Sequence, residues 1–346
     1  MKNKEMTQRY SSWGDKLLRH CDVLNVIQKD KIWHPINVQL SLTEACDSNC
    51  PFCSVANRPV SSHMPWKTLI RTLAGFAQLG AKSVELTGGG NPMLYRDGEK
   101  NINDVIAACW HYGFKIGIIT NSHNLTKIEP EFFRKVDWLR ISLSKLDEGY
   151  KPADYDLGEF PRERVGFSYI IHEGTTEESL TMIKDLVVMY PETKFVRLAG
   201  DCLIQGDNVR IFEKWSKFID SLDYDKMFFK DIQDQDIPFN DGCYVGMIRP
   251  YVAPHPEGRD RPYQVYVCTS HVLNTQKYDM EYSLGSFYEI VEIWRGASDR
   301  LANGDTPYEI GCSSKGWSEQ CKHCFYQNNN KILHTVVTKM EDEDFA

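Results

Sequence analysis

Between residues 36 and 200, short runs of apolar residues alternate with longer segments that have a helical pattern of apolar positions. The short runs are typical of buried strands. They lie at 36–42, 82–87, 115–120, 138–144, 165–171 and 194–200. We therefore predict six strands in this part of the chain.

The longer segments predict helices between these strands. They lie at 66–80, 101–113 and 175–190, with a further helix at 208–226. Thr175 or Thr176 can cap the start of the third helix, whose first turn is acidic, and both features favour a helix N-terminus. Strands separated by helices predict an α/β fold with a mostly parallel sheet. In parallel βα barrels, the chemistry gathers at the carboxyl ends of the strands.

The character of the sequence changes near residue 235. Beyond it lie five of the eleven cysteines together with Pro, Gly and Tyr, and helical periodicity returns only at 288–296. We therefore expect four parts along the chain. They are an N-terminal extension (1–32), a βα domain (33–235), a small cysteine-rich domain (236–330) and a C-terminal tail (331–346).

Composition and charge narrow the classes of function. The formal net charge of the 346-residue chain is −8 at pH 7, which argues against a surface built to bind a nucleic-acid backbone. The N-terminus lacks the apolar core of a signal peptide, and no run of about 18 apolar residues follows. We therefore expect a cytoplasmic protein without a membrane span. Because cytoplasmic thiols stay reduced, clustered cysteines more often bind metal than form disulfides.

Three cysteines, Cys46, Cys50 and Cys53, directly follow the first predicted strand in the spacing Cys-x3-Cys-x2-Cys. Thiolates are soft ligands that suit iron–sulfur clusters and zinc. Iron–sulfur clusters normally take four cysteines, so three would leave one iron open to another ligand. The alternative is a zinc site that borrows a fourth ligand such as His63. Closed zinc sites favour paired short spacings, and no partner pair lies nearby in the sequence.

This motif, with Phe52 as its aromatic residue, resembles that of the radical S-adenosylmethionine (radical SAM) superfamily over roughly residues 33–235. The resemblance implies a partial (β/α)6 TIM-like barrel in which Cys46, Cys50 and Cys53 hold a [4Fe-4S] cluster. The fourth iron would bind S-adenosylmethionine, and Phe52 would pack beside its adenine. An external one-electron reductant, such as flavodoxin or ferredoxin, would support cleavage to a 5′-deoxyadenosyl radical that abstracts a hydrogen atom from substrate.

The segment LTGGGNP (86–92) ends the second predicted strand where the family has a Gly-Gly-Glu-Pro type of motif. The resemblance implies that Gly88, Gly89 and Gly90 let the backbone approach the methionine amino group and accept its hydrogen bonds. Asn91 stands where the motif usually has Glu, which removes a charge but keeps a carbonyl acceptor. The alternative is an ordinary Gly-rich turn between a strand and a helix.

The resemblance to the family also implies roles for three further residues. Asn121, after the third strand, and Ser142, in the fourth, stand where family members place polar groups near the ribose or the methionine. Each could equally be a turn or strand-end residue. Arg197, in the sixth strand, could pair with the cofactor carboxylate or with a substrate acid, because an Arg in an apolar run needs a partner. A structural carboxylate would satisfy Arg197 equally well.

A second set of cysteines lies beyond residue 235. Cys321 and Cys324 form a Cys-x2-Cys pair, and residues 251–268 predict a hairpin that ends in a cysteine. This arrangement resembles the SPASM/twitch extension of a radical SAM subgroup. In the twitch form it implies an auxiliary [4Fe-4S] cluster held by Cys243, Cys268, Cys321 and Cys324. Cys312 is then a free thiol or a substitute for one of them. The alternative is a structural zinc knot with the same four cysteines.

The sequence thus predicts a radical SAM enzyme, of oxidoreductase or mutase type, that acts on a small-molecule or nucleotide-like substrate. The segment before the first predicted strand at 36–42 is too short for the peptide-binding domain that modifiers of ribosomal peptides often carry. A peptide-modifying radical SAM/SPASM maturase is the alternative within this chemistry. From other classes, the alternatives are a non-catalytic iron–sulfur electron-transfer protein and a zinc-stabilised binding protein.

Overall fold

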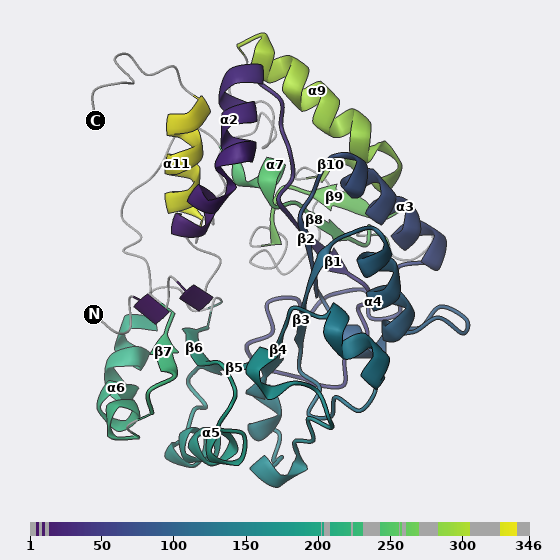
Figure 1. Cartoon of the computed structure of the whole chain (residues 1–346). Helices are drawn as coiled ribbons and strands as arrows, with labels where there is room; N and C mark the ends of the chain where they lie inside the picture. Colours follow the sequence, from purple (N-terminus) through teal and green to yellow (C-terminus); the bar gives the residue numbers. More distant parts are fainter. Residues whose placement is uncertain are drawn as a thin grey trace.

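A ten-stranded sheet forms the centre of the protein, in the order β10–β9–β8–β1–β2–β3–β4–β5–β6–β7 (Figure 1). The computed structural model describes residues 5–6, 9–10, 14–201, 203, 208–222, 224–230, 243–255, 257, 261–269, 283–304 and 326–337. The strands are β1 (Asn37–Ser41), β2 (Ser83–Thr87), β3 (Lys115–Thr120), β4 (Trp138–Ser142), β5 (Val165–Ile171), β6 (Val196–Gly200), β7 (Met227–Phe229), β8 (Tyr251–Ala253), β9 (Gln264–Tyr266) and β10 (Ser283–Ser286). Within the described residues the sheet is open, with β10 and β7 at its ends.

The first seven strands run parallel, each beside the next in the chain. The six predicted strands are therefore confirmed, as is the mostly parallel α/β fold. The seventh strand, β7, was not expected. The helix predicted at 208–226 ends earlier, at Ser221, and the chain after it forms β7 beside β6.

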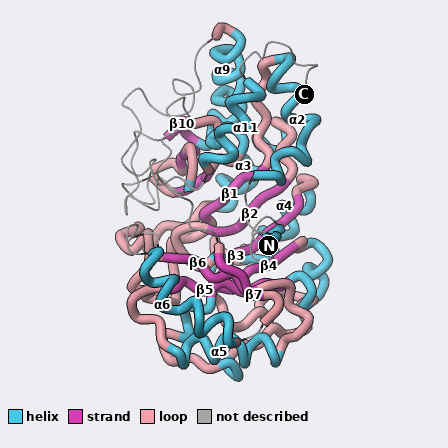
Figure 2. Tube along the Cα trace, turned by 90° about the vertical axis from the view of Figure 1, so that its left-hand side faces the viewer, coloured by secondary structure: helices cyan, strands magenta, loops and turns pink. Residues whose placement is uncertain are grey.

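Helices cover the outside of the curved sheet (Figures 1 and 2). The α-helices are α2 (Cys21–Asp30), α3 (Trp66–Gln78), α4 (Ile102–His111), α5 (Glu177–Met189), α6 (Asn208–Ser221), α7 (Val245–Ile248), α9 (Ile290–Ala302) and α11 (Gln327–Val337). The 3-10 helices are η1 (Gly14–His20), η2 (Pro92–Leu94), η3 (Pro130–Lys135), η4 (Leu143–Leu146), η5 (Pro152–Asp154), η6 (Arg162–Arg164) and η8 (Phe287–Glu289). As predicted, Thr176 caps α5 by accepting a hydrogen bond from the backbone N–H of Ser179. In the described ranges, none of the helices combines the length and hydrophobicity needed to cross a membrane.

The two faces of the parallel strands differ in polarity. Alternate residues of a strand point to opposite faces. One face carries fully buried side chains such as Leu40, Leu86 and Ile118, which share a core with the inner sides of α3 and α4. The opposite face carries Gln39 of β1 and Glu85 of β2, which are register partners. The polar face lines the interior of the open barrel and provides the surface on which a site can be built.

The C-terminal elements extend the same sheet rather than forming a separate one. Strand β8 pairs parallel to β1, and β9 pairs antiparallel to β8, so the hairpin predicted at 251–268 is present. Helix α9 packs on α3 through Trp294 and Phe76, whose ring centroids are 5.4 Å apart. Residues 331–337, expected in the tail, continue helix α11, which lies beside α2 (Figure 1).

Candidate functional site

The three cysteines of the motif lie on one loop after the carboxyl end of β1. All three are partly buried and none is in a disulfide. The backbone N–H of Cys53 donates to the carbonyl oxygen of Cys50 at 3.1 Å, which closes a turn between them. Burial raises the pKa of Cys46, and it raises the pKa of Cys50 to about 11. The Cys53 and Cys46 thiols add to the rise in the pKa of Cys50.

Two side chains direct N–H groups at these sulfurs. The Nδ2 of Asn121 lies 3.6 Å from the Sγ of Cys46, and the Nη1 of Arg58 lies 3.5 Å from the Sγ of Cys53. Arg58 is held in place by its Nε, which donates to the carbonyl oxygen of Glu44 at 2.8 Å. Hydrogen bonds to sulfur tune the reduction potential of an iron–sulfur cluster. Sequence reasoning singled out Asn121 but missed Arg58, since its spacing from the motif carries no signal.

The glycine-rich turn after β2 packs directly on the start of the cysteine loop. The backbone N–H of Gly90 donates to the carbonyl oxygen of Thr43 at 3.1 Å, and that of Asn91 donates to Ala45 at 2.8 Å. A methyl group on Gly90 would lie 2.1 Å from the carbonyl oxygen of Ala45, and one on Gly89 would overlap the Glu44 carboxylate. The close approach that these glycines allow is therefore used, at least in part, to seat the turn against the loop.

Asn91 is the centre of a buried hydrogen-bond network. Its carbonyl oxygen accepts from the Thr120 hydroxyl at 2.7 Å and from the backbone N–H of Met93 at 3.1 Å. Its amide nitrogen donates to Asp47 at 3.0 Å and to the Ser122 hydroxyl at 2.9 Å. A glutamate carboxylate could only accept hydrogen bonds. Asn91 therefore donates a hydrogen bond to Asp47 that a glutamate at this position could not donate.

Asp47 also contacts a buried lysine. The Nζ of Lys145, whose side chain is only 2% exposed, lies 3.3 Å from the Oδ2 of Asp47 and 4.0 Å from Glu148. Burial acts to raise the pKa of Asp47, but the hydrogen bond from Asn91 and the Lys145 ammonium outweigh it and lower that pKa. Sequence reasoning missed this pair. The available signal was a lysine directly after a buried strand, where an ammonium needs a partner.

Phe52 lies over a histidine rather than in open space. Its ring centroid is 4.7 Å from that of His172, which follows β5. His172 is buried, and its Nε2 lies 3.3 Å from the Oδ2 of Asp147. The aromatic residue of the motif therefore connects the cysteine loop to the carboxyl end of β5.

Ser142 and Arg197 lie on the polar face but not in the Asn91 network. Ser142 pairs in register with Ser168 of β5, and Ser168 pairs with Arg197 of β6, so the three form a row across neighbouring strands. The Nε of Arg197 is buried and has no hydrogen-bond partner within the described residues. Burial, followed by the nearby Arg140, holds the pKa of Arg197 well below its usual value.

Two of the five later cysteines lie within the described residues. Cys243 is buried two residues before α7, and the Nδ2 of Asn330 on α11 lies 3.7 Å from its Sγ. Cys268 follows β9 and lies close enough to Arg249 to influence its pKa. The remaining three, Cys312, Cys321 and Cys324, lie outside the described residues.

The zinc alternative for the first site relied on His63. The Nε2 of His63 lies 3.8 Å from the Oδ1 of Asp97, and its backbone pairs with Thr43. Within the described ranges, no three His, Cys, Asp or Glu side chains are grouped so that they could hold one metal ion. This holds for Cys46, Cys50 and Cys53 as well, so the fit of the loop to an iron–sulfur cluster rests on its donor types, three thiols on one loop with N–H groups directed at two of them.

Known proteins resemble this chain in sequence over about a third of its length. Residues 40–154 match the radical SAM superfamily. The GTP 3′,8-cyclase of Tolumonas auensis is 32% identical over 114 residues, which are 32% of this chain and 33% of that protein. The GTP 3′,8-cyclase of Marinobacter nauticus is 28% identical over 124 residues, 34% of this chain and 36% of that protein. The matched part thus spans about a third of the length of these curated relatives.

The fold resembles solved structures over most of the chain. SuiB of Streptococcus suis bound to the precursor peptide SuiA matches with a TM-score of 0.51 and 16% identity, over 81% of this chain and 69% of SuiB. The same protein bound to S-adenosylmethionine matches with a TM-score of 0.50 and 15% identity, over 83% of this chain and 73% of SuiB. At this identity the likeness concerns the fold alone. The match to the radical SAM superfamily therefore concerns residues 40–154, and the likeness to SuiB extends the comparison of folds beyond them.

Proposed function

We propose that this protein cleaves S-adenosylmethionine reductively and abstracts a hydrogen atom from a small-molecule or nucleotide-like substrate. One observation carries the proposal: the loop that bears three free cysteines at the carboxyl end of β1 is joined to the glycine-rich turn after β2 through Asp47 and Asn91. When bound, a [4Fe-4S] cluster and S-adenosylmethionine would supply a 5′-deoxyadenosyl radical. The electron would come from an external reductant such as flavodoxin or ferredoxin.

The residues of the chain would hold and orient these groups. Cys46, Cys50 and Cys53 would ligate three irons, and the N–H groups of Asn121 and Arg58 would stabilise the charge on two of the sulfurs. The Asn91–Asp47–Lys145 network would fix the loop before the cluster binds, so that little ordering remains to be done on binding.

The remaining predicted residues would contact the cofactor. Backbone carbonyl groups of Gly88–Gly90 would accept from the methionine amino group. Phe52, already packed on His172, would lie beside the adenine. Ser142 and Arg197 extend the polar face into the barrel, where they would contact the ribose, the cofactor carboxylate or the substrate.

A second cluster in a twitch-type domain is part of the proposal. Cys243 and Cys268 would provide two of its ligands, together with Cys321 and Cys324. The hairpin of β8 and β9 and the packing of Asn330 against Cys243 support an ordered frame around this site. An auxiliary cluster would accept the electron left on a substrate radical, which favours an oxidation.

The name of the curated relatives supports a nucleotide-like substrate over a peptide. GTP 3′,8-cyclase takes a nucleotide by its name. The likeness to SuiB, which is seen with a precursor peptide, extends over more of the chain but concerns the fold. We therefore favour a small substrate.

The iron and sulfide content of the anaerobically reconstituted protein tests this proposal. We expect about eight of each per chain for two clusters, falling to about four when Cys46, Cys50 and Cys53 are replaced by Ala. Adding S-adenosylmethionine should change the spectrum of the wild-type cluster, because one iron is open to it. Cys21→Ala, at an exposed cysteine, is the matched control and should change nothing. A full complement of iron in the triple variant would contradict the proposal.

A further inference from the structure

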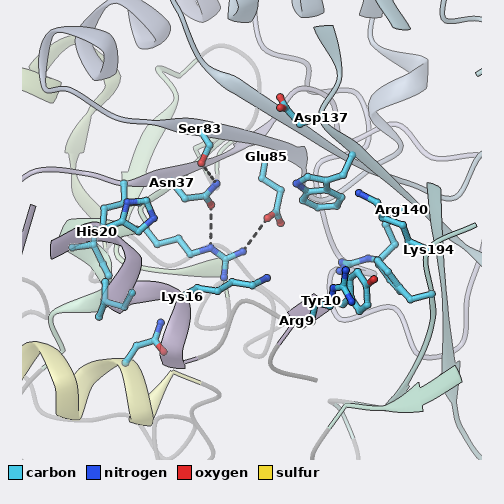
Figure 3. Close-up of a pocket in the computed structure, with 17 residues that line it drawn as sticks. Arg9, Tyr10, Lys16, His20, Asn37, Ser83, Glu85, Asp137, Arg140 and Lys194 are labelled. Carbon is cyan, nitrogen blue, oxygen red and sulfur yellow. Dashed lines mark hydrogen bonds and ion pairs between the residues drawn. The ribbon is translucent and has the colours of Figure 1, made fainter. Parts of the chain in front are cut away.

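A cavity of about 490 Å³ (Figure 3) opens at the amino ends of the parallel strands. Asn37 and Ser83, the first residues of β1 and β2, line it together with Trp138, the first residue of β4. The cysteine loop and the glycine-rich turn follow the other ends of β1 and β2. The cavity and the candidate cluster site are therefore separated by the length of the strands. Its volume is that of a site for a small organic molecule.

The walls of this cavity carry more positive than negative charge. The cations are Arg9, Lys16, His20, Arg140, Lys194 and Arg249, and the carboxylates are Glu85 and Asp137. In Figure 3, Arg9, Arg140 and Lys194 gather on the side away from His20. Even with His20 neutral, five cations face two carboxylates.

Both carboxylates already have protein partners. Glu85 accepts from the Nε2 of Gln39 at 2.8 Å and pairs with the Nη2 of Arg249 at 3.1 Å. Arg249 is also fixed by Asn37, whose Oδ1 accepts from its Nε at 3.1 Å. Asp137 accepts from the backbone N–H of Ile116 at 2.8 Å. Arg249 therefore has an ion-pair partner, Glu85, within the protein.

Arg140, in contrast, lacks a hydrogen-bond partner for one of its nitrogens among the described residues. Its Nε is buried and has no hydrogen-bond partner in the part of the chain that the structure describes. The same holds for Arg197, which lies further along the polar face. A buried cation without a hydrogen-bonded counter-ion is costly, so such groups normally have one. Burial lowers the pKa of Arg140, and Arg249 adds to this, whereas Glu85 only partly offsets it.

Aromatic side chains form the apolar part of the same cavity. Trp138, Tyr10 and Phe195 all line it, and the rings of Tyr10 and Phe195 have centroids 4.6 Å apart. A cavity with flat apolar walls and several convergent cations suits an organic molecule with an anionic group.

We propose that this cavity binds the oxyanion group, phosphate or carboxylate, of a small organic molecule, with Arg140 as its main contact. Resting on the proposed function, we infer that this molecule is the substrate, held by its anionic end at the amino side of the sheet. The rest of the substrate extends along the polar face, past Arg197, toward the cysteine loop. Guanidinium groups bind both kinds of oxyanion through charge-assisted hydrogen bonds.

Calorimetric titration of the purified whole chain with inorganic pyrophosphate and with citrate tests this inference. At least one of the two anions should bind, and more weakly as the salt concentration rises. Arg140→Gln should weaken binding by about 10- to 100-fold, because it removes a charge-assisted hydrogen bond. Arg140→Lys should restore part of the affinity. Lys67→Gln makes the same change of charge at an exposed position on α3 and should have no effect.

The titration results distinguish the possible ligands and show whether the inference is wrong. Tighter binding of pyrophosphate indicates a phosphorylated ligand, and tighter binding of citrate indicates a polycarboxylate. If neither anion binds, or if Arg140→Gln binds as tightly as the wild type, the inference is wrong. If Arg140→Gln does not fold, the double variant Lys16→Gln/Lys194→Gln, at two exposed positions of the cavity, replaces it. Binding by this double variant as tight as that of the wild type would then contradict the inference.

This titration needs neither the cluster nor S-adenosylmethionine. A protein that cleaves S-adenosylmethionine but binds neither anion overturns only the inference about the cavity. A protein that binds an anion but does not cleave S-adenosylmethionine overturns only the proposed function.

Discussion

At the carboxyl end of the sheet, the buried ammonium of Lys145 lies 3.3 Å from Asp47, whereas at the amino end the buried Nε of Arg140 has no hydrogen-bond partner within the described residues. The first arrangement is internally satisfied, with Asn91 using all of its hydrogen-bonding groups on protein partners. The second leaves a buried nitrogen of a cation without a hydrogen bond among the described residues. In our proposals, the first end of the sheet would hold a cluster in a fixed geometry, and the second would bind the anionic group of a substrate.

Loss of a cysteine tests whether the two ends are independent, and it has the largest expected effect. In Cys50→Ala, S-adenosylmethionine cleavage should fall by more than the about 10- to 100-fold that outer-shell changes cost at metal sites. The affinity for the anion should stay unchanged, because the cavity lies at the opposite strand ends. Product analysis and calorimetry on the same preparation measure both. Joint loss of the two properties, in a variant that remains folded, would show that the ends are coupled.

Removing Lys145 tests the satisfied end. Lys145→Met removes the cation beside Asp47, whose side chain is 40% exposed, and we expect the free energy of unfolding to fall by about 1.5 to 3 kcal/mol. Lys67→Met, the same change at an exposed position of α3, should stay within about 0.5 kcal/mol of the wild type. Urea unfolding measures both. Equal effects at the two positions would contradict the role given to Lys145.

The effect of Lys145→Met on stability should depend on pH. The pKa of Asp47 is lowered in the folded protein, so its stabilising contribution is fully present above the pKa of an unfolded Asp, about 4. That contribution is lost as the pH falls through the lower pKa of the folded state. The difference in stability between the wild type and Lys145→Met should therefore be constant near neutral pH and shrink below about pH 4.

Exchanging the partners in the Asn91 network has the next largest effect. Asn91→Asp removes the donor to Asp47 and places two carboxylates together, which should cost about 2 to 3 kcal/mol of unfolding free energy. The double variant Asp47→Asn/Asn91→Asp restores one donor and one acceptor, and should recover at least about 1 kcal/mol. Additive losses in the double-mutant cycle would argue against this contact.

Substitutions in the glycine-rich turn should cause a smaller loss of stability. Gly90→Ala drives a methyl group into the backbone of the cysteine loop, at Ala45, and should cost about 1 to 3 kcal/mol. Gly89→Ala meets side-chain atoms of Glu44 rather than backbone and should cost less. Gly296→Ala on α9 has open space around it and should stabilise the protein by about 0.5 to 1 kcal/mol. Thermal unfolding ranks the three, and a different order would contradict the packing described.

The smallest predicted effect has the opposite sign. Arg140→Met removes a buried cation that lacks a hydrogen-bonded partner, and should raise the free energy of unfolding by about 1 kcal/mol while weakening anion binding. Arg249→Met is the matched change at the same cavity. It leaves the buried Glu85 without its ion pair and should destabilise the protein. If both variants lose stability equally, the contrast between the paired and the unpaired arginine is wrong.

The sequence predicts the parallel strands well and the C-terminal pairings poorly. Strands such as 115–120 and 165–171 are nearly continuous apolar runs because helices cover one of their faces and the barrel core the other. The pairing of β8 with β1 joins residues more than two hundred positions apart, and nothing in the local pattern of 251–253 specifies it. Helix α11 likewise packs on α2 from the other end of the chain.

The contacts of the candidate site also divide into those that the local sequence predicts and those that it does not. The cysteine loop and the glycine-rich turn are visible in the sequence because their spacing is local. The contacts of Lys145 with Asp47 and of Arg58 with Cys53 depend on how loops meet after folding, so spacing alone does not reveal them. Glu85 and Arg140 did leave a signal, since each is a charge inside an apolar run, but identifying the unpaired one requires the structure.

The most direct test of the proposed function is the formation of 5′-deoxyadenosine. The anaerobically reconstituted protein is given dithionite and S-adenosylmethionine, and the nucleoside is quantified by chromatography with mass detection. We predict that the wild-type protein releases 5′-deoxyadenosine and that the variant lacking Cys46, Cys50 and Cys53 does not. Absence of the nucleoside from wild-type protein that carries an intact, reduced cluster at this loop would contradict the account.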